Sequence, residues 1–431
     1  MIIITSPPEH FSGEMDVPGD KSITHRALML GSIARGVTEV RGFLDAEDCR
    51  STMGCLNTLG ATINVRGRRL FVHGKGGQLQ APTAELDAGN SGTTARLLAG
   101  ILAGSHFESK ITGDSSLQQR PMKRIVEPLK AMGAEIEGAA GGDKLPLTIK
   151  GKNLKAVHYK SPKASAQVKS AVLLAALYAE EETVFEEPYQ SRDHTELMLK
   201  HFGAQLVAEP GLVKIKGRQT LQGKLVLVPG DISTAAFFMV AAAILPGSEV
   251  LLKNVGVNPT RTGIIDVLKE MGAHLEIENP RKWGMEPVGN IRVKGGRPLK
   301  GVEVKGEIIP RLIDEIPILA VAAAVAEGET IIGDASELRV KESDRISDLA
   351  GQLKRLDIAI SEKEDGFVIR GGKPLKGAEL DSCGDHRIAM ALAVAGLVAS
   401  GETAVNAAEV VAVSFPGFMQ SLRSLCSKKN H

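Results

Sequence analysis

Hydrophobic residues are gathered along this chain into runs rich in Ala and Leu, each introduced by a short polar turn. A helix that is apolar on every face belongs inside a protein core, so these runs predict buried helices. Their starts lie roughly 70 to 80 residues apart, which is too long for a solenoid repeat but suits a small module of several elements. The six runs begin at Ser22, Ser91, Ala166, Ser233, Asp314 and His386.

A second helix is predicted after most of these runs, and it ends in a shared phrase in which an apolar residue is followed by Gly and Ala. A glycine just beyond an apolar helix is the expected left-handed stop, and the alternating residues after it predict a strand. Each module is therefore expected to contain two helices, the second facing solvent on one side, together with several strands. The phrase begins at Leu59, Met132, Phe202 and Met271, and a fifth copy at Leu356 lacks the glycine.

Two Pro-Gly-Asp phrases divide the chain into halves. Residues 18–22 read Pro-Gly-Asp-Lys-Ser, and residues 229–233 read Pro-Gly-Asp-Ile-Ser. Proline and glycine favour a turn of the kind that begins a domain. A length of 431 residues also favours two domains over one. We therefore predict three modules in each half, with a substrate site between the halves.

Composition excludes several classes of function. The net charge is +1 and aromatic residues make up 3% of the chain, so neither a basic field nor stacking platforms for nucleic acid are expected. Apolar stretches are shorter than the ~20 residues that a membrane span requires. The four cysteines form no Cys-x-x-Cys pair, which disfavours a structural zinc site. We expect a cytoplasmic protein that binds neither nucleic acid nor membrane.

Polar groups at the starts of the runs are candidates for binding anions. Lys21, Ser22 and Arg26 place a point charge, a hydroxyl and a planar guanidinium at one helix start, which suits phosphate or carboxylate. The alternative is a Ser-capped helix with solvated cations. Residues 90–94 form a small-residue loop that lets backbone N–H groups approach an anion, and residues 165–169 again place small polar groups at a helix start. For residues 90–94 taken alone, a plain N-cap turn is the favoured explanation.

Two carboxylates are candidates for proton transfer. Glu342 lies in the charge run 339–345, which is usual for a solvated face, although two cations flanking one acid also suit a reaction between anions. Asp314 directly precedes an apolar run. An N-cap role would account for it, as it would for the other aspartates that precede such runs, Asp20, Asp231 and Asp385.

Two further segments combine an acid, a histidine and an arginine. Residues 192–196 read Arg-Asp-His-Thr-Glu and fit a helix start with acids in its first turn, from which we retain Arg192 for ligand contact. Residues 385–387 read Asp-His-Arg and fit a cap followed by surface residues. The chain has no nucleophile elbow, so a Ser-His-Asp triad is not expected.

Taken in order, these segments resemble the EPSP synthase family, and within it the class II branch of bacterial enzymes. The resemblance runs from Pro18 to Phe418 and is specific because it rests on six motifs in combination. They are Pro-Gly-Asp-Lys-Ser-Ile-Thr-His-Arg from Pro18, Gly-Asn-Ser-Gly-Thr-Thr-Ala-Arg from Gly89, Gln-Arg-Pro-Met from Gln119, Ala-Ser-Ala-Gln-Val-Lys-Ser-Ala from Ala164, Leu-Arg-Val-Lys-Glu-Ser-Asp-Arg from Leu338 and Asp-His-Arg-Ile-Ala-Met from Asp385.

The resemblance implies an α/β (α+β) fold, a two-domain inside-out barrel of six βαβαββ modules with three modules per domain, helices inside and sheets outside. One domain would contain residues 1–20 and 230–431, the other residues 21–229, and the active site would lie in the cleft between them. It also implies an enzyme that needs no metal or organic cofactor. We expect this enzyme to be a monomer.

The substrates implied by the resemblance are shikimate 3-phosphate and phosphoenolpyruvate. Their combined negative charge must be offset before they can meet, so many cationic contacts are expected. Shikimate 3-phosphate would be bound by Lys21, Ser22, Arg26, Ser165, Ala166, Gln167, Arg192, Asp314 and Lys341. Phosphoenolpyruvate would be bound by Lys21, Gly92, Arg120, Gln167, Arg345 and Arg387.

The reaction implied by the resemblance is transfer of the enolpyruvyl group to the 5-hydroxyl of shikimate 3-phosphate. Asp314 would take the hydroxyl proton, and Glu342 or Lys21 would protonate C3 of phosphoenolpyruvate. Many members of the family carry a lysine shortly before a late Phe-Pro, where this chain has Val413, so one phosphate contact is missing or replaced. Gly92 stands where some glyphosate-tolerant relatives have Ala, so we expect the site to admit glyphosate as an inhibitor.

Two alternative functions stay open at this stage. The sister enzyme that transfers enolpyruvate to UDP-N-acetylglucosamine has the same fold but uses a loop cysteine, and residues 114–122 contain none. A non-catalytic ligand-binding protein of the same fold would need no acid–base pair. The retention of Asp314 and Glu342 disfavours it.

Overall fold

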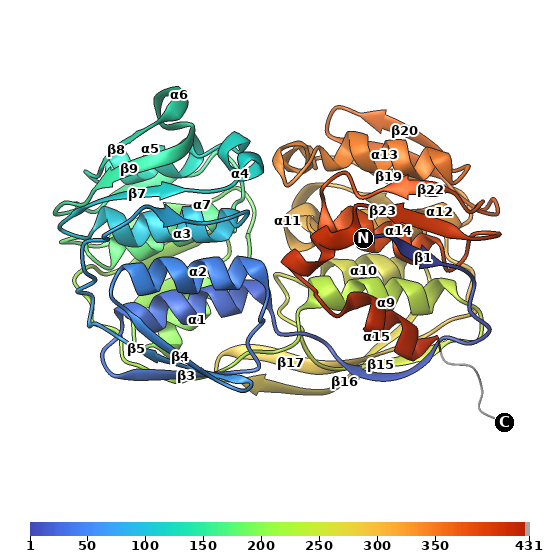
Figure 1. Cartoon of the computed structure of the whole chain (residues 1–431), viewed down its shortest axis with the longest axis horizontal. Helices are drawn as coiled ribbons and strands as arrows, with labels where there is room; N and C mark the ends of the chain where they lie inside the picture. The colour runs from blue at the N-terminus through green and yellow to red at the C-terminus, as the bar shows by residue number, and fades with distance from the viewer. Residues whose placement is uncertain (427–431) are drawn as a thin grey trace. The chain divides into compact units, whose positions relative to one another are not determined.

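The computed structural model describes residues 1–426, which form two compact units with separate hydrophobic cores (Figure 1). The terminal unit consists of residues 1–18, 229–281 and those from Pro287 onward. The central unit consists of residues 19–228 together with Lys282–Glu286. No helix within the described residues is long and apolar enough to cross a membrane.

The elements of the central unit fall into three modules. Its strands are β3 (Val37–Arg41), β4 (Thr62–Arg66), β5 (Arg69–His73), β6 (Leu86–Asp87), β7 (Glu108–Thr112), β8 (Glu135–Gly138), β9 (Lys144–Lys150), β10 (His158–Lys160), β11 (Thr183–Glu186), β12 (Leu206–Glu209), β13 (Leu212–Ile215) and β14 (Leu225–Leu227). Its helices are α1 (Lys21–Ile33), α2 (Glu47–Thr58), α3 (Gly92–Ala103), α4 (Ser115–Gln119), α5 (Lys123–Ala131), α6 (Ala139–Gly142), α7 (Ala166–Ala176) and α8 (His194–His201).

The terminal unit repeats the same arrangement. Its strands are β1 (Ile3–Thr5), β2 (Ser12–Asp16), β15 (Glu249–Gly256), β16 (His274–Trp283), β17 (Glu286–Lys294), β18 (Glu303–Val304), β19 (Glu329–Ile332), β20 (Ala359–Lys363), β21 (Gly366–Arg370), β22 (Glu379–Asp381) and β23 (Thr403–Asn406). Its helices are α9 (Ile232–Ile244), α10 (Gly263–Glu270), α11 (Ile309–Leu312), α12 (Ile316–Val325), α13 (Arg345–Arg355), α14 (His386–Ala395) and α15 (Phe418–Leu425), with 3₁₀ turns η1 (Gly306–Ile308), η2 (Ser336–Val340) and η3 (Ala408–Val413).

The modules share one strand order. The strand that precedes the first helix lies parallel to the strand that follows it, and the last strand lies antiparallel to that second strand. The four-stranded sheets that result are β14-β3-β5-β4, β6-β7-β9-β8, β10-β11-β13-β12, β16-β17-β15-β2 and β18-β19-β21-β20. This order confirms the predicted α/β fold built from βαβαββ modules.

Three strands pair with a module that is distant in sequence. Strand β2 precedes α1 in the chain, yet it lies parallel to β15 of the terminal unit. Strand β14 precedes α9, yet it lies parallel to β3 of the central unit. In the last module, β1 from the start of the chain lies antiparallel to β23 and occupies the position of a final strand. Long-range pairing therefore completes the first, fourth and sixth modules.

The first helix of each module is buried, as the hydrophobic runs predicted. In the terminal unit every residue of α9 and α14 is buried, and so is every residue of α12 before Val325. In α1, α3 and α7 the residues outside the core lie at the helix starts, namely Lys21, Ser22, Thr93, Ala166 and Gln167. Second helices are one-sided, since α10 buries Ile264 and Leu268 and exposes Asp266 and Lys269. Polar groups of the first helices are therefore concentrated at their N-termini.

Second helices stop as predicted, by a left-handed residue just beyond the last turn. Its φ is +82° at Gly60, +102° at Gly133, +94° at Gly203 and +98° at Gly272. The fifth copy keeps the same geometry without glycine, because Asp357 adopts φ +67°. Aspartate tolerates this region better than most residues, so the stop survives the substitution.

One segment lies outside the unit that was expected from the sequence. Residues 230–431 were assigned to one domain, but Lys282–Glu286 groups with the central unit. One contact of this segment is a hydrogen bond between His194 Nδ1 and Glu286 Oε1 (2.7 Å), in which both side chains are buried. The other boundaries lie one or two residues from the expected positions.

The left-handed stop predicts opposite effects of the same substitution at two exposed glycines. A Cβ meets no atom within 4 Å at either Gly203, which has φ +94°, or Gly351, which lies inside α13. We expect Gly203→Ala to lower the free energy of unfolding by about 1–2 kcal/mol, and Gly351→Ala to raise it by about 0.5–1 kcal/mol. Urea unfolding measures both, and a stabilised Gly203→Ala would contradict the assignment of the stop.

Candidate active site

The start of α1 presents the first group of candidate residues. Asp20 caps this helix, because its Oδ1 accepts a hydrogen bond from the Ile23 N–H (2.8 Å), so the alternative of a Ser22 cap is wrong. Lys21 follows the cap and forms an ion pair with Asp48 of α2 (2.8 Å). Lys21 and Ser22 are therefore held at a helix N-terminus, whose dipole favours a negative ligand.

Arg26 lies one turn further along α1 and is buried among uncharged partners. Its guanidinium donates to Thr195 Oγ1 (2.7 Å), Ser170 Oγ (2.7 Å) and Ser22 O (3.0 Å). Burial lowers the pKa of Arg26 to about 10, although the charges of Glu196 and Asp20 oppose this shift. The side chain is still cationic at neutral pH, and an anion would offset its charge better than these neutral partners do.

The starts of α3 and α7 are joined through Gln167. Ser91 caps α3 with its side-chain oxygen, so the N-cap explanation is confirmed for residues 90–94, and Ser165 caps α7 in the same way. Arg96 Nη1 donates to Gln167 Oε1 (2.8 Å), and Gln167 Nε2 donates to Thr93 Oγ1 (3.2 Å). The starts of α3 and α7 therefore meet at the Gln167 amide, and the serine caps leave this amide available as a candidate ligand-binding group.

Gly92 opens α3 between two arginines. Arg120 is buried and donates to Asn90 O (3.2 Å) and Asn90 Oδ1 (2.5 Å). A Cβ at Gly92 would lie 2.6 Å from Arg96 Nη1 and 3.7 Å from Arg120 Nη1. The glycine thus leaves space beside two guanidinium groups that a larger residue would fill.

Arg192 is half-buried and lies directly before α8. The alternative for residues 192–196, a helix start with an acid in its first turn, is confirmed, because α8 begins after Asp193 and carries Glu196 in its first turn. Glu196 is buried and forms an ion pair with Lys169 Nζ (2.8 Å), which also pairs with Glu187 (2.8 Å). The first-turn acid of α8 is thus buried and paired with Lys169.

Asp314 lies in the turn between α11 and α12, and it does not cap a helix. Glu315 occupies the position before α12. Asp20, Asp231 and Asp385 do cap their helices through their carboxylates. The N-cap explanation is confirmed for those three residues and wrong for Asp314, so the Asp314 side chain has a different role.

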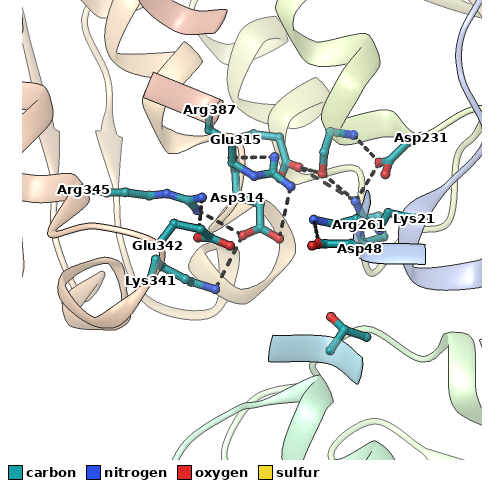
Figure 2. Close-up of polar contacts among 12 residues, drawn as sticks. Lys21, Asp48, Asp231, Arg261, Asp314, Glu315, Lys341, Glu342, Arg345 and Arg387 are labelled. Atoms are coloured by element: carbon teal, nitrogen blue, oxygen red, sulfur yellow. Dashed lines mark hydrogen bonds and ion pairs between the residues drawn. The ribbon is translucent and has the colours of Figure 1, made fainter. Parts of the chain in front are cut away.

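Three cations surround the Asp314 carboxylate, as Figure 2 shows. Its Oδ1 lies 3.5 Å from Lys341 Nζ and 3.5 Å from Arg345 Nη1, and its Oδ2 lies 3.8 Å from Arg387 Nη2. Arg387 Nη1 also donates to the Asp314 backbone oxygen (3.0 Å). The side chain is 13% exposed, so a ligand can reach a carboxylate that is already flanked by anion-binding groups.

Arg345 is the centre of this charged group. Its side chain is 1% exposed, Nε lies 2.7 Å from Asp385 Oδ2, and Nη2 lies 2.7 Å from Glu342 Oε2. Burial alone would lower the pKa of Arg345, but the carboxylates of Asp385, Glu342 and Asp314 outweigh it and raise the pKa above its usual value. The interpretation of residues 339–345 as a solvated face is therefore wrong at Arg345.

Asp385 connects this group to α14. It caps the helix by accepting from the Arg387 N–H (2.8 Å), and it binds Arg345 at the same time. His386 and Arg387 are 2% and 7% exposed, so the prediction of surface residues after the cap is wrong. The acid, the histidine and the arginine all lie inside the terminal unit.

The candidate arginines have different partners in the two units, whereas Lys21 and Lys169 of the central unit, like the cations of the terminal unit, pair with carboxylates. In the terminal unit Lys341, Arg345 and Arg387 face carboxylates. In the central unit the hydrogen bonds described above for Arg26 and the neighbouring arginines go to hydroxyl, amide and carbonyl oxygens. The second arrangement suits binding of phosphate, and the first suits proton transfer beside a charged ligand. Among residues 1–426 no group of three or more His, Cys, Asp or Glu is placed to hold a metal ion.

Sequence reasoning missed three residues that hold the candidates in place. Arg96 follows the glycine of the 90–94 loop by one helical turn, and this spacing could have indicated it. Asp48 binds Lys21, which lies 27 residues away, and Glu315 binds Ser233, which lies 82 residues away. Neither partner is signalled by local sequence, because only the packing of the helices brings them together.

Buried His25 predicts a pH dependence of stability. Its Nδ1 lies 2.7 Å from Thr52 Oγ1, and burial, followed by the charges of Lys21 and Arg26, holds its pKa well below the usual 6.5. The unfolded chain therefore binds a proton that the folded chain does not, so stability is lost as the pH falls below about 6.5. As the pH falls below about 6.5, the free energy of unfolding of the wild type, measured with urea, should drop by roughly 1.4 kcal/mol more per pH unit than that of His25→Gln. Equal slopes for the two proteins would contradict this prediction.

Known proteins share this sequence and fold over nearly the whole chain. The model of the family EPSP synthase (3-phosphoshikimate 1-carboxyvinyltransferase) matches residues 5–422. The 3-phosphoshikimate 1-carboxyvinyltransferase of Desulforamulus reducens is 53% identical over 427 residues, which cover 99% of each chain. That of Geobacter sp. strain M21 is 54% identical over 417 residues, 96% of this chain and 97% of the relative. A solved EPSP synthase structure from Acinetobacter baumannii matches with a TM-score of 0.87 and 46% identity, covering 98% of each chain.

Substrate chemistry follows from this match, because the family acts on shikimate 3-phosphate and phosphoenolpyruvate, two anions of the kind that the clustered cations suit. The chain belongs to the EPSP synthase family and is a transferase that moves the enolpyruvyl group of phosphoenolpyruvate to shikimate 3-phosphate.

Proposed function

We propose that the chain carries out this transfer with residues of both units, and that Asp314 is the general base. The position of Asp314 supports this assignment most strongly. Its carboxylate caps no helix and lies within 3.8 Å of Lys341, Arg345 and Arg387. A carboxylate beside cations that hold anionic substrates is placed to accept a proton from one of them.

Shikimate 3-phosphate is assigned mainly to the central unit. A phosphate needs several charge-assisted hydrogen bonds, each worth roughly 1.5–3 kcal/mol, and the start of α1 offers two cations and a hydroxyl. Lys341 of the terminal unit would bind the ring hydroxyls. The full proposed set is Lys21, Ser22, Arg26, Ser165, Ala166 through its backbone, Gln167, Arg192, Asp314 and Lys341.

Phosphoenolpyruvate is assigned to cations of both units. Arginine suits its carboxylate and phosphate, because the guanidinium binds planar and tetrahedral oxyanions with two parallel hydrogen bonds. Gly92 would let the ligand approach Arg120 closely, since a Cβ there would lie 3.7 Å from Arg120 Nη1. The full proposed set is Lys21, Gly92, Arg120, Gln167, Arg345 and Arg387.

The chemistry follows as addition and elimination. Asp314 would take the proton of the 5-hydroxyl while that oxygen attacks C2 of phosphoenolpyruvate, and Glu342 or Lys21 would give a proton to C3. The tetrahedral intermediate would then lose phosphate from C2 and a proton from C3, which restores the double bond and yields the enolpyruvyl ether. Holding the two substrates in contact should supply much of the acceleration, and proton transfer about 10²–10⁴-fold.

We also propose that the enzyme works as a monomer in the cytoplasm. Both proposed substrate sets are drawn from a single chain, and the relatives with matching sequences are bacterial enzymes.

Replacing the base tests this proposal. Asp314→Asn should lower kcat for phosphate release about 10²–10⁴-fold with shikimate 3-phosphate as acceptor, because the amide cannot take the hydroxyl proton. Asp16→Asn is a matched control in the same unit, since its side chain is 60% exposed on β2, and it should leave kcat unchanged. Full activity of Asp314→Asn would remove Asp314 from the role of base.

The acceptor is tested in the same assay. Phosphate release with UDP-N-acetylglucosamine in place of shikimate 3-phosphate would transfer the chain to the sister activity. No release with either acceptor would leave a ligand-binding protein of this fold.

Gly92 yields a prediction about glyphosate, which we propose as an inhibitor at the phosphoenolpyruvate site. A Cβ at 2.6 Å from Arg96 Nη1 would displace a buried guanidinium that holds Gln167. Gly92→Ala should therefore weaken glyphosate inhibition about tenfold or more, equivalent to at least ~1.4 kcal/mol. Gly54→Ala, at an exposed helix position with no atom within 4 Å of the added Cβ, is the control. A millimolar inhibition constant for wild type that Gly92→Ala does not change would contradict the assignment.

A further inference from the structure

We propose that Ser233, Glu315 and Arg261 form a buried brace that positions Asp314 for proton transfer. The inference rests on the proposed function, because Asp314 is the base whose position the brace controls. The three are positioning residues, since they act through Asp314 and its backbone.

Glu315 follows Asp314 in the chain, and the two carboxylates face different groups (Figure 2). Asp314 lies beside Lys341 and Arg345, whereas Glu315 is 0% exposed and accepts a hydrogen bond from Ser233 Oγ. The helix that follows is apolar throughout. Burying a carboxylate at its first turn is costly, so a specific role is required to account for it.

Ser233 links an anion to a cation through one atom. Its Oγ donates to a Glu315 carboxylate oxygen and accepts from Arg261 Nη2 (2.7 Å). A hydroxyl donates and accepts at the same time, which neither alanine nor an apolar residue can do. The Ser233 N–H donates to Asp231 Oδ1 (2.8 Å), so the start of α9 fixes the serine in place.

Arg261 supplies the positive charge of the brace. Its side chain is 2% exposed, and Nη2 lies 3.2 Å from Asp231 Oδ1 and 3.9 Å from Glu315 Oε1. One guanidinium thus offsets the burial of two carboxylates. Because Arg261 precedes α10, the brace ties the starts of α9, α10 and α12 to one another.

Arg387 holds the same turn at the preceding residue. Its Nη1 donates to the Asp314 backbone oxygen (3.0 Å), while the brace holds the adjoining Glu315 side chain. The backbone that carries Asp314 is therefore fixed at two consecutive residues. A displacement of about 1 Å at a reacting group can lower a rate about 100-fold, so this fixation bears directly on turnover.

Removing the serine hydroxyl tests the brace. Ser233→Ala should lower kcat about 10- to 100-fold and leave KM for both substrates within about twofold. The reason is that a misplaced Asp314 slows proton transfer without weakening substrate binding. Ser248→Ala is the matched control, since Ser248 is a buried serine of the same unit that donates to Ala242 O and Leu245 O. Ser248→Ala should keep the wild-type kcat.

A second pair of variants separates positioning from loss of folding. Glu315→Gln keeps an oxygen that accepts from Ser233, whereas Glu315→Ala does not. We expect Glu315→Gln to retain at least about tenfold more kcat than Glu315→Ala, with unfolding midpoints recorded for both. Equal kcat values in two folded variants would overturn the brace.

A double-mutant cycle shows whether the effect passes through Asp314. Single-turnover phosphate release with Asp314→Asn should be unchanged when Ser233→Ala is added, because the carboxylate that the brace positions is already gone. Full additivity would reveal a general structural effect and overturn the inference. A wild-type enzyme that releases no phosphate would instead overturn the proposed function. An active wild type with an unchanged Ser233→Ala would overturn the brace alone.

Discussion

Burial of the first helix of every module on all its faces is the constraint from which the rest of this structure follows. A helix inside a core has no solvent side, so its polar residues have to lie at its ends. In α1, α3 and α7 the residues outside the core are at the N-termini, and in the terminal unit the turns before α9, α12 and α14 carry the aspartates. Helix N-termini favour anions, so the same packing that makes the cores also gathers the groups that are proposed to bind the anionic substrates.

The electrostatic character of each unit follows from the partners of its buried cations. Arg345 is balanced by Asp385 and Glu342, which fixes its guanidinium and keeps it charged inside the core. The hydrogen bonds of Arg26 go instead to hydroxyl and carbonyl oxygens, which suits its proposed role in binding phosphate. The paired charges beside Asp314 suit the proposed proton transfer, and the arginines of the central unit suit the proposed binding of phosphate.

Local features of this structure were predictable from sequence, and distant ones were not. The buried helices and the glycine stops follow from composition and spacing within about 20 residues, which is why the stop at Gly272 and the cap at Asp385 were anticipated. The family resemblance supplied the candidate residues, but not the fact that Asp314 caps no helix. The exchange of β2 and β14 depends on strand pairing, and the bond of Glu315 to Ser233 joins residues 82 positions apart. The family resemblance implied that residues 1–20 join the second half, whereas the partner of Glu315 has no signature in the local sequence.

The central claim is that both units act on one substrate, and calorimetric binding of shikimate 3-phosphate tests it most directly. Arg26→Gln removes a cation of the central unit, Lys341→Gln removes one of the terminal unit, and Arg66→Gln removes an exposed cation of β4 as a control. We predict that the first two variants each raise Kd about 10- to 100-fold and that the control leaves it unchanged. Wild-type affinity in Lys341→Gln, together with weak binding in Arg26→Gln, would contradict the claim by confining the substrate to one unit.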